Sequence, residues 1–250
     1  MSLLVDYQER LSAQNVFGVL LVLQGIDASG KDSTVKHVMS GVNPRGVEVR
    51  SFKEPSAEEL TRDFLWRYQR RLPERGRIGI FNRSHYEEVL VVRVHPELLA
   101  AERLPVPADK VHLWKSRCRQ INEWEHHLAD NGITVVKVFL HLSKKEQAKR
   151  FLRRIDDPAK HWKFSPGDIL ERKLWDEYQV AFEQMLSHTS TEWAPWYVVP
   201  ADHKWFTRLA TAAVLIRALA ETNPQHPEVT DEIRREMTQA RRSLLEEIEG

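Results

Sequence analysis

The segment VFGVLLVLQGIDASGKDST, residues 16–34, decides the fold class. It begins with an apolar run typical of a strand buried on both faces and continues into a loop that contains Gly25 and Gly30. A helical pattern follows. A strand, a glycine-containing loop and a helix in this order are the context of a phosphate-binding loop, because successive N–H groups of the loop point at one anion. The segment therefore predicts a P-loop in an α/β protein.

The loop has the spacing G-x-x-x-x-G-K, with Gly25, Gly30 and Lys31 at the fixed positions. The two glycines allow the backbone to curl tightly, and Lys31 adds a full positive charge to the partial charge of the helix N-terminus. We expect phosphates to contact residues along the whole loop. These are Gly25, Ala28, Ser29, Gly30, Lys31, Asp32, Ser33 and Thr34.

One position departs from the usual pattern: Asp32 follows the lysine, where Ser or Thr normally holds magnesium. Either Ser33 or Thr34 takes over this role, or the metal is held by Asp27 inside the loop. We favour Asp27, because a carboxylate is a hard oxygen ligand suited to Mg²⁺. The expected cofactor is Mg²⁺, with Mn²⁺ as the alternative.

Short apolar strands alternate with longer helical patterns along the rest of the chain, which is typical of a parallel sheet flanked by helices on both faces. The expected strands are Val16–Gly25, Val47–Lys53, Arg77–Phe81, Ile133–Leu142 and Trp196–Val199. Two helices are expected to open with capping boxes, at Ser56–Glu59 and at Ser143–Glu146. Further helices are expected over Ala108–Asp130, Pro166–Ser187 and Pro227–Gly250. The last is amphipathic and is expected to dock on the body or on a second subunit.

Size and composition narrow the class of protein. The 250 residues suffice for one domain, 1–250, with one substantial core. The net charge of +1 argues against a nucleic-acid partner, and the apolar run near residue 16 is too short to span a membrane. Cys118 is the single cysteine, so no intramolecular disulfide forms. These features predict a cytoplasmic protein that neither crosses nor binds a membrane.

A second informative stretch is RIGIFNRSHYEE, residues 77–88, which reads as a buried strand and its exit. In P-loop proteins the end of this strand commonly carries an acid that binds magnesium through water, but here the residue is Asn82. Arg83 follows at the carboxyl end of the sheet, where ligands of open α/β folds bind. We therefore expect Arg83 to contact a bound phosphate.

Together the two stretches resemble the polyphosphate kinase type 2 family. The family's loop G-x-D-x-x-G-K is matched at residues 25–31, and its motif D-R-S-x-Y is matched at residues 82–86 with Asn82 in place of Asp. The resemblance runs from about residue 15 to about residue 215, and includes residues 153–158, 162–166 and 196–206. Residues 79–95 look like the subgroup called class III, which is credited with phosphorylating both nucleoside monophosphates and diphosphates.

The resemblance implies a P-loop kinase-like sheet with a helical lid at about residues 152–175. The C-terminal helix, at about 227–249, is expected from the amphipathic pattern alone. The resemblance also implies reversible transfer of the terminal phosphoryl group of inorganic polyphosphate to AMP, ADP or both. Asp27, Lys31 and Arg83 are the implied catalytic residues, and Arg153 and Arg154 are implied polyphosphate contacts at the lid edge. Glu87 returns a carboxylate near Asn82, so the metal candidates are Asp27, Glu87 and Asn82.

Nucleotide recognition is less specific in the sequence. Adenine nucleotides are expected, with guanine nucleotides as an extension, and the protein is expected to form a homo-oligomer. The candidate nucleotide contacts are Arg93, Arg117, Lys163, Asp168 and Arg172.

Two alternatives remain. An ATP-dependent nucleoside monophosphate kinase of the thymidylate kinase type shares the fold and reaction class, but it predicts Ser or Thr after the loop lysine, where this chain has Asp32. A P-loop module that binds nucleic acid predicts salt-dependent binding of DNA or RNA and no phosphoryl transfer. Use of polyphosphate without ATP separates the first alternative from the main hypothesis.

Overall fold

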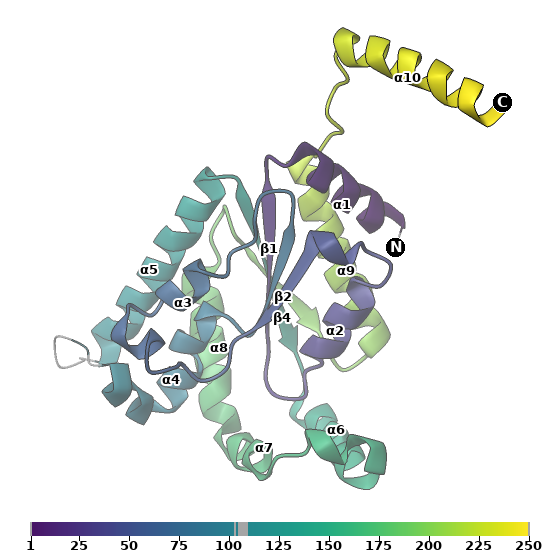
Figure 1. Cartoon of the computed structure of the whole chain (residues 1–250). Coiled ribbons are helices and arrows are strands. Elements are labelled where there is room, and N and C mark those ends of the chain that lie inside the picture. The colour runs from purple at the N-terminus through teal and green to yellow at the C-terminus, as the bar shows by residue number, and fades with distance from the viewer. Residues whose placement is uncertain (1, 103, 105–109, 250) are drawn as a thin grey trace.

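A five-stranded parallel sheet with the order β2-β3-β1-β4-β5 forms the centre of the computed structural model, which describes residues 2–102, 104 and 110–249 (Figure 1). The strands are β1 Gly18–Gln24, β2 Val47–Ser51, β3 Ile78–Asn82, β4 Ile133–His141 and β5 Trp196–Pro200. All five strands expected from the sequence are present, and their ends lie within two residues of the expected ones. The α/β fold class with a parallel sheet is confirmed.

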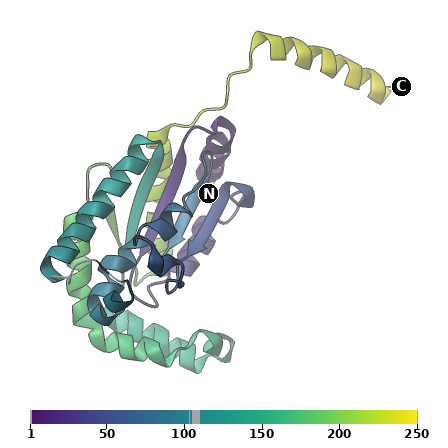
Figure 2. The same ribbon diagram turned by 60° about the vertical axis from the view of Figure 1, so that its left-hand side comes forward.

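Helices cover both faces of the sheet (Figures 1 and 2). The α-helices are α1 Ser2–Gln14, α2 Lys31–Val38, α3 Trp66–Gln69, α4 Val91–Val94, α5 Lys110–Asp130, α6 Lys144–Asp156, α7 Pro166–Glu171, α8 Trp175–Thr189, α9 Lys204–Thr222 and α10 Asp231–Glu249. Short 3₁₀ helices are η1 Pro44–Gly46, η2 Glu59–Thr61, η3 His85–Val89, η4 Pro96–Glu102, η5 Pro158–Lys163 and η6 Arg172–Leu174. The expected helix start at Ala108 and end at Gly250 lie outside the described residues.

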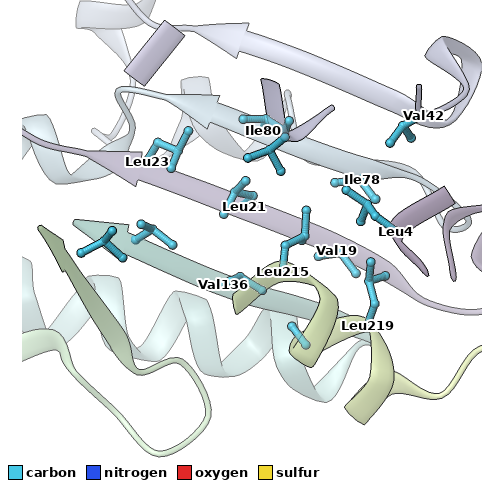
Figure 3. Close-up of a cluster of buried hydrophobic side chains, with 14 of the residues drawn as sticks. Leu4, Val19, Leu21, Leu23, Val42, Ile78, Ile80, Val136, Leu215 and Leu219 are labelled. Atoms are coloured by element: carbon cyan, nitrogen blue, oxygen red, sulfur yellow. The ribbon is translucent and has the colours of Figure 1, made fainter. Parts of the chain in front are cut away.

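The central strand β1 shows how the two layers are built. Its seven residues are all buried, as expected for a strand covered on both faces. Alternate side chains point to opposite faces, so Val19, Leu21 and Leu23 pack with leucines of α1 and α9 (Figure 3). Leu20 and Val22 pack instead into a second core with α5 and α8. Two hydrophobic cores therefore hold the sheet from both sides.

Two helix expectations were wrong. Ser56 and Glu59 make the reciprocal hydrogen bonds of a capping box, but the element that follows is only the turn η2, and residues 52–65 carry no α-helix. The helix expected over Pro166–Ser187 is interrupted by η6, because Leu174 leaves helical geometry with φ −89° and ψ 23°. The helices α1 and α9 were not anticipated.

The C-terminal helix α10 projects away from the rest of the chain (Figures 1 and 2). All of its residues are exposed, including the apolar side chains Ile233, Met237 and Leu244. It makes no contact with the body that would bury its apolar stripe. No helix among the described residues is both long and apolar enough to cross a membrane.

Candidate active site

The sheet register brings the two informative loops together. In the parallel ladder Leu23 of β1 lies opposite Asn82 of β3, so both strands end at the same edge of the sheet. The P-loop leaves β1 at that edge, and the turn with Arg83 leaves β3 beside it. Neighbouring strand ends of this kind are where open α/β sheets bind ligands.

The P-loop needs glycine at two positions. Gly25 has φ +153°, and a Cβ there would lie 2.8 Å from the carbonyl oxygen of Leu140. Gly30 precedes helix α2 with φ +101°, a left-handed conformation that costs glycine little. Both glycines let the backbone turn back over the start of α2.

Lys31 lies inside this loop. Its Nζ donates to the carbonyl oxygen of Gly25 at 2.5 Å, and burial lowers the pKa of its ammonium group. The carboxylates of Asp27, Glu87 and Asp32 oppose that change. A partly desolvated ammonium group surrounded by loop carbonyls is positioned to exchange those contacts for a phosphate oxygen.

Arg83 is held in an unusual backbone conformation. Its φ of +62° lies in the left-handed region, which a residue with a side chain seldom adopts. Its Nη2 donates to Asp27 Oδ1 at 3.1 Å, so the strand-end arginine and the P-loop acid are directly paired. Burial raises the pKa of the nearby Glu87 carboxyl, while Arg83 and Lys31 act against that rise.

Three cavities meet at Arg83, which lines each of them. The first, which we call the cationic cavity, has a volume of about 590 Å³ and adjoins the P-loop. Its basic lining residues are Lys31, Lys53, Arg83, Arg150, Arg153, Arg154, Lys160, Lys163 and Lys204. So many cations around one space favour a polyanionic ligand.

The second space, which we call the apolar cavity, has a volume of about 270 Å³. Phe52, Pro55, Phe64 and Val92 contribute to its walls. It also contains the buried Glu88, whose carboxyl pKa is raised by burial to about 7 even though Arg117 lies nearby. Charged side chains, among them Arg67 and Glu102, complete the lining. Apolar side chains beside polar groups suit a flat organic ring that also forms hydrogen bonds.

The third space, which we call the mixed cavity, has a volume of about 400 Å³. It lies between the P-loop, the β3 exit and helix α7, and its lining includes Asp27, Lys31, Glu87, Asp168 and Arg172. Asp27, Lys31 and Arg83, the three catalytic candidates from the sequence, therefore line one cavity.

The segment from α6 to η6 contributes arginines to the site edge. Arg154 Nη1 donates to Asp168 Oδ2 at 2.8 Å, and Arg153 Nη2 donates to Glu146 Oε1 at 2.7 Å. Arg153, Arg154 and Lys163 line the cationic cavity. The sequence-derived candidates from this segment thus lie together.

Arg93 and Arg117 lie elsewhere. Arg117 is buried and donates to the carbonyl oxygen of Glu88 at 2.9 Å, and it also pairs with Glu102. The Arg93 guanidinium lies 5.9 Å from the centre of the Trp114 ring. Neither arginine lines the cationic, apolar or mixed cavity.

Sequence reasoning missed several residues at the site. Arg150 is buried and donates through Nη1 to the carbonyl oxygens of Ala28 and Ser29, at 2.9 and 3.0 Å, which fixes the shape of the P-loop. Lys204 begins helix α9 and lines the cationic cavity. Arg150 stood out only as one of many basic residues in α6, and nothing local in the sequence distinguishes Lys204.

The donor set around the P-loop fits a divalent cation that is held mainly by substrate. The carboxylates of Asp27, Asp32 and Glu87 each raise the pKa of Lys31, so all three lie near its ammonium group. Among the described residues no group of three or more His, Cys, Asp or Glu side chains is close enough to hold a metal by itself. Mg²⁺ commonly takes one or two carboxylates and completes its shell with phosphates and water.

Comparisons with known proteins agree with this geometry. The family model for polyphosphate kinase 2 matches residues 2–227. The chain is 52% identical over 243 residues to an ADP-polyphosphate phosphotransferase of Rhodopseudomonas palustris, covering 97% of this chain and 84% of that one. It is 47% identical over 221 residues to an AMP/ADP-polyphosphate phosphotransferase of Meiothermus ruber, covering 88% and 79%. The crystal structure of polyphosphate kinase 2 from Arthrobacter aurescens TC1 superimposes with a TM-score of 0.88 at 40% identity, covering 98% and 83%.

Proposed function

The chain belongs to the polyphosphate kinase 2 family, and from that membership we propose that it transfers the terminal phosphoryl group of inorganic polyphosphate to AMP and to ADP, giving ADP and ATP. The observation that carries the proposal is the convergence of the cationic, apolar and mixed cavities on Arg83 beside the P-loop. A donor, an acceptor and the transferring group can then meet at one point. The reaction is reversible.

Polyphosphate lies in the cationic cavity in this proposal, with its terminal phosphates on the P-loop. Every phosphate unit carries charge, so a wall that includes Arg153, Lys160 and Lys204 suits a chain of such units. Lys204 supports this assignment independently, because burial and then the neighbouring Arg150 and Arg153 lower the pKa of its ammonium group. Cations that repel one another in this way gain stability when an anion lies between them.

The nucleotide acceptor lies on the other side of Arg83. We propose that its base enters the apolar cavity, whose walls include Phe52 and Phe64. Its phosphates would then lie at the end of this cavity that is lined by Arg83 and Glu87. Lys163, Asp168 and Arg172 stay proposed nucleotide contacts at the edges of the cationic and mixed cavities. Adenine fits this description, and guanine has the same ring size.

Transfer between two phosphates needs little covalent chemistry. It needs in-line positioning and positive charge around the migrating group, which Lys31, Arg83 and the loop amides supply. No general base is needed, since the attacking group is already an anionic phosphate oxygen. We propose Mg²⁺, or Mn²⁺ in its place, with Asp27 and Glu87 as carboxylate ligands; the ion would neutralise phosphate charge when bound.

The segment from about residue 152 to 175 is proposed to act as a lid. It lies beside the P-loop, and its arginines line the cationic cavity. A lid that closes over the phosphates excludes water and so limits hydrolysis. Asp168 holds Arg154 at this edge through their ion pair.

We also propose that residues 1–250 act as one phosphotransferase domain that assembles into a cytoplasmic homo-oligomer. The exposed apolar stripe of α10 supports the assembly, because a second copy would cover Ile233, Met237 and Leu244. Light scattering of the chain with and without residues 229–250 tests this. An equal number of chains per particle would exclude α10 as the subunit contact.

The deciding experiment is incubation of the purified protein with polyphosphate, Mg²⁺ and AMP in the absence of ATP. Chromatography follows ADP and then ATP, and we expect both in turn. If a parallel incubation with ADP gives ATP but AMP is not converted, polyphosphate is the donor and AMP is not an acceptor. If polyphosphate yields neither product while ATP phosphorylates a monophosphate, the chain is a conventional nucleotide kinase.

A further inference from the structure

A cluster of buried charges lies directly behind the turn that carries Arg83 and Glu87. Lys137 of β4 and Glu125 of α5 are both 0% exposed, and their Nζ and Oε2 atoms are 2.6 Å apart. Lys137 also donates to Tyr86 Oη at 2.9 Å and to the carbonyl oxygen of Thr189 at 2.6 Å. The ammonium group therefore has three partners and no contact with solvent.

The turn η3 is attached to this cluster at two consecutive residues. Tyr86 Oη donates to Glu125 Oε1 at 2.7 Å, and His85 Nε2 lies 3.1 Å from the same oxygen. Burial lowers the pKa of His85, so its ring is neutral and Nε2 donates to the carboxylate. Glu125 thus holds both residues that follow Ser84.

A buried cluster of charges adds little to the stability of the fold compared with apolar side chains of similar size. Removing two charges from water costs several kcal/mol per ion, and apolar replacements of a buried pair are often as stable. The cluster adjoins the second core: Tyr86 belongs to that core, and Lys137 Nζ lies 5.3 Å from the centre of the Trp196 ring, which also belongs to it. Its presence there calls for a role besides packing.

The strained residue next to it supplies that role. A left-handed conformation is unfavourable at a residue with a side chain such as Arg83, and it persists only when the surrounding structure fixes it. On one flank Asn82 ends β3 and bonds to Asp32. On the other flank Ser84 accepts from Gln24 Nε2 at 3.2 Å, and His85 and Tyr86 are attached to the buried charges.

We propose that the Lys137–Glu125 pair is a positioning device that fixes His85 and Tyr86 and thereby holds Arg83 in its left-handed conformation, aimed at the transferring phosphate. The role of the aimed arginine rests on the proposed function. Neither Lys137 nor Glu125 touches substrate, and neither lines the cationic, apolar or mixed cavity. A displacement of Arg83 by about 1 Å would slow transfer on the order of 100-fold while leaving the phosphate-binding loop intact.

The test replaces both charges by apolar side chains of similar size, in the double variant Lys137→Met/Glu125→Leu. We expect a lower melting temperature, because His85, Tyr86 and the Thr189 carbonyl lose buried hydrogen-bond partners. We also expect kcat to fall by about 30-fold or more, with KM for polyphosphate and nucleotide within about 3-fold. A kcat within about 2-fold of the wild type would overturn the proposal. Thr211→Val is the matched control, because it removes a buried hydrogen bond on the opposite face of the sheet and leaves Arg83 untouched.

A milder variant decides the matter if the double variant does not fold. Tyr86→Phe removes the hydroxyl that links the turn to both charges and leaves the Lys137–Glu125 pair in place. We expect its kcat to fall by about 5-fold or more with KM unchanged, and an unchanged kcat would refute the proposal.

A crystal structure of whichever variant folds gives a readout that does not depend on turnover. The φ angle of Arg83 should leave the left-handed region, and retention of φ near +62° would refute the proposal even if transfer were slow. If the wild type itself transfers nothing from polyphosphate, the proposed function fails, and the φ angle still tests the positioning.

Discussion

The side-chain amide of Asn82 donates a hydrogen bond to the carboxylate of Asp32, so the two positions that depart from the usual P-loop pattern touch one another. The usual pattern has Ser or Thr after the lysine and Asp at the strand end. Here the carboxylate stands in the loop and the neutral side chain at the strand end. The two departures are therefore related. The carboxylate that the strand end usually supplies comes here from Asp32 of the loop, in contact with Asn82.

This contact predicts strong coupling between the two positions. Asn82→Asp alone places two carboxylates in contact, and we expect kcat/KM to fall by about 10- to 100-fold because like charges repel and the hydrogen-bond donor is lost. Asp32→Asn combined with Asn82→Asp restores one acid and one amide, and should recover most of the loss. A double-mutant cycle on kcat/KM measures this coupling. Additive effects would mean that the contact has no part in transfer.

Lys31→Ala and Asp27→Asn should each abolish transfer without loss of the fold. Lys31 supplies the charge inside the loop, and Asp27 both pairs with Arg83 and is the proposed metal ligand. We expect kcat to fall by about 1000-fold or more for Lys31→Ala, since preorganised charge carries most of the catalysis in phosphoryl transfer. Steady-state assays with unfolding curves measure both effects. Lys36→Ala, an exposed lysine in the same helix, is the control, and near-normal turnover of Lys31→Ala would refute the P-loop mechanism.

The predictable parts of this molecule are those encoded by neighbouring residues. The P-loop spacing from Gly25 to Lys31 and the apolar runs of the five strands were sufficient to predict the fold, and they indicate the proposed phosphate site. Arg83 could also be assigned to the site from its place at a strand end. Local patterns carry this information because a buried parallel strand and a glycine loop each need a specific run of residues.

The features that could not be predicted depend on residues far apart in the chain. Lys137 reads as an interruption of an apolar strand until Glu125 is seen beside it. The contact of Arg150 with the P-loop spans more than a hundred residues. The failed helix at Ser56 shows the limit in the other direction, because a correct capping box does not ensure that a helix follows. Long-range contacts decided the cases of Lys137 and Arg150.

The cationic cavity predicts a dependence on donor length and salt. Lys204→Ala removes one of the cations that line the cavity, so binding of long polyphosphate, which contacts more of the lining, should weaken more than binding of tripolyphosphate. We expect KM for long chains to rise by about 3- to 10-fold with little change in kcat, and the effect to shrink as ionic strength screens the charge. Assays with both donors at two salt concentrations measure it. Arg241→Ala on the projecting helix α10 is the control, and equal effects on both donors would argue against this path for the chain.

The buried Glu88 predicts a stability that depends on pH. Burial raises its carboxyl pKa to about 7, so the folded state keeps a proton that the unfolded state releases near its ordinary value of 4.5. The resulting stabilisation is therefore present in full below pH 4.5 and is lost as pH rises through 7, by about 3 kcal/mol at most. Glu88→Gln stays neutral at all pH values, so its free energy of unfolding relative to the wild type should increase from pH 5 to pH 8. Urea unfolding of both proteins across this range measures the difference, with Glu183→Gln on the exposed face of α8 as control. A constant difference between wild type and Glu88→Gln would show that Glu88 does not bind the extra proton.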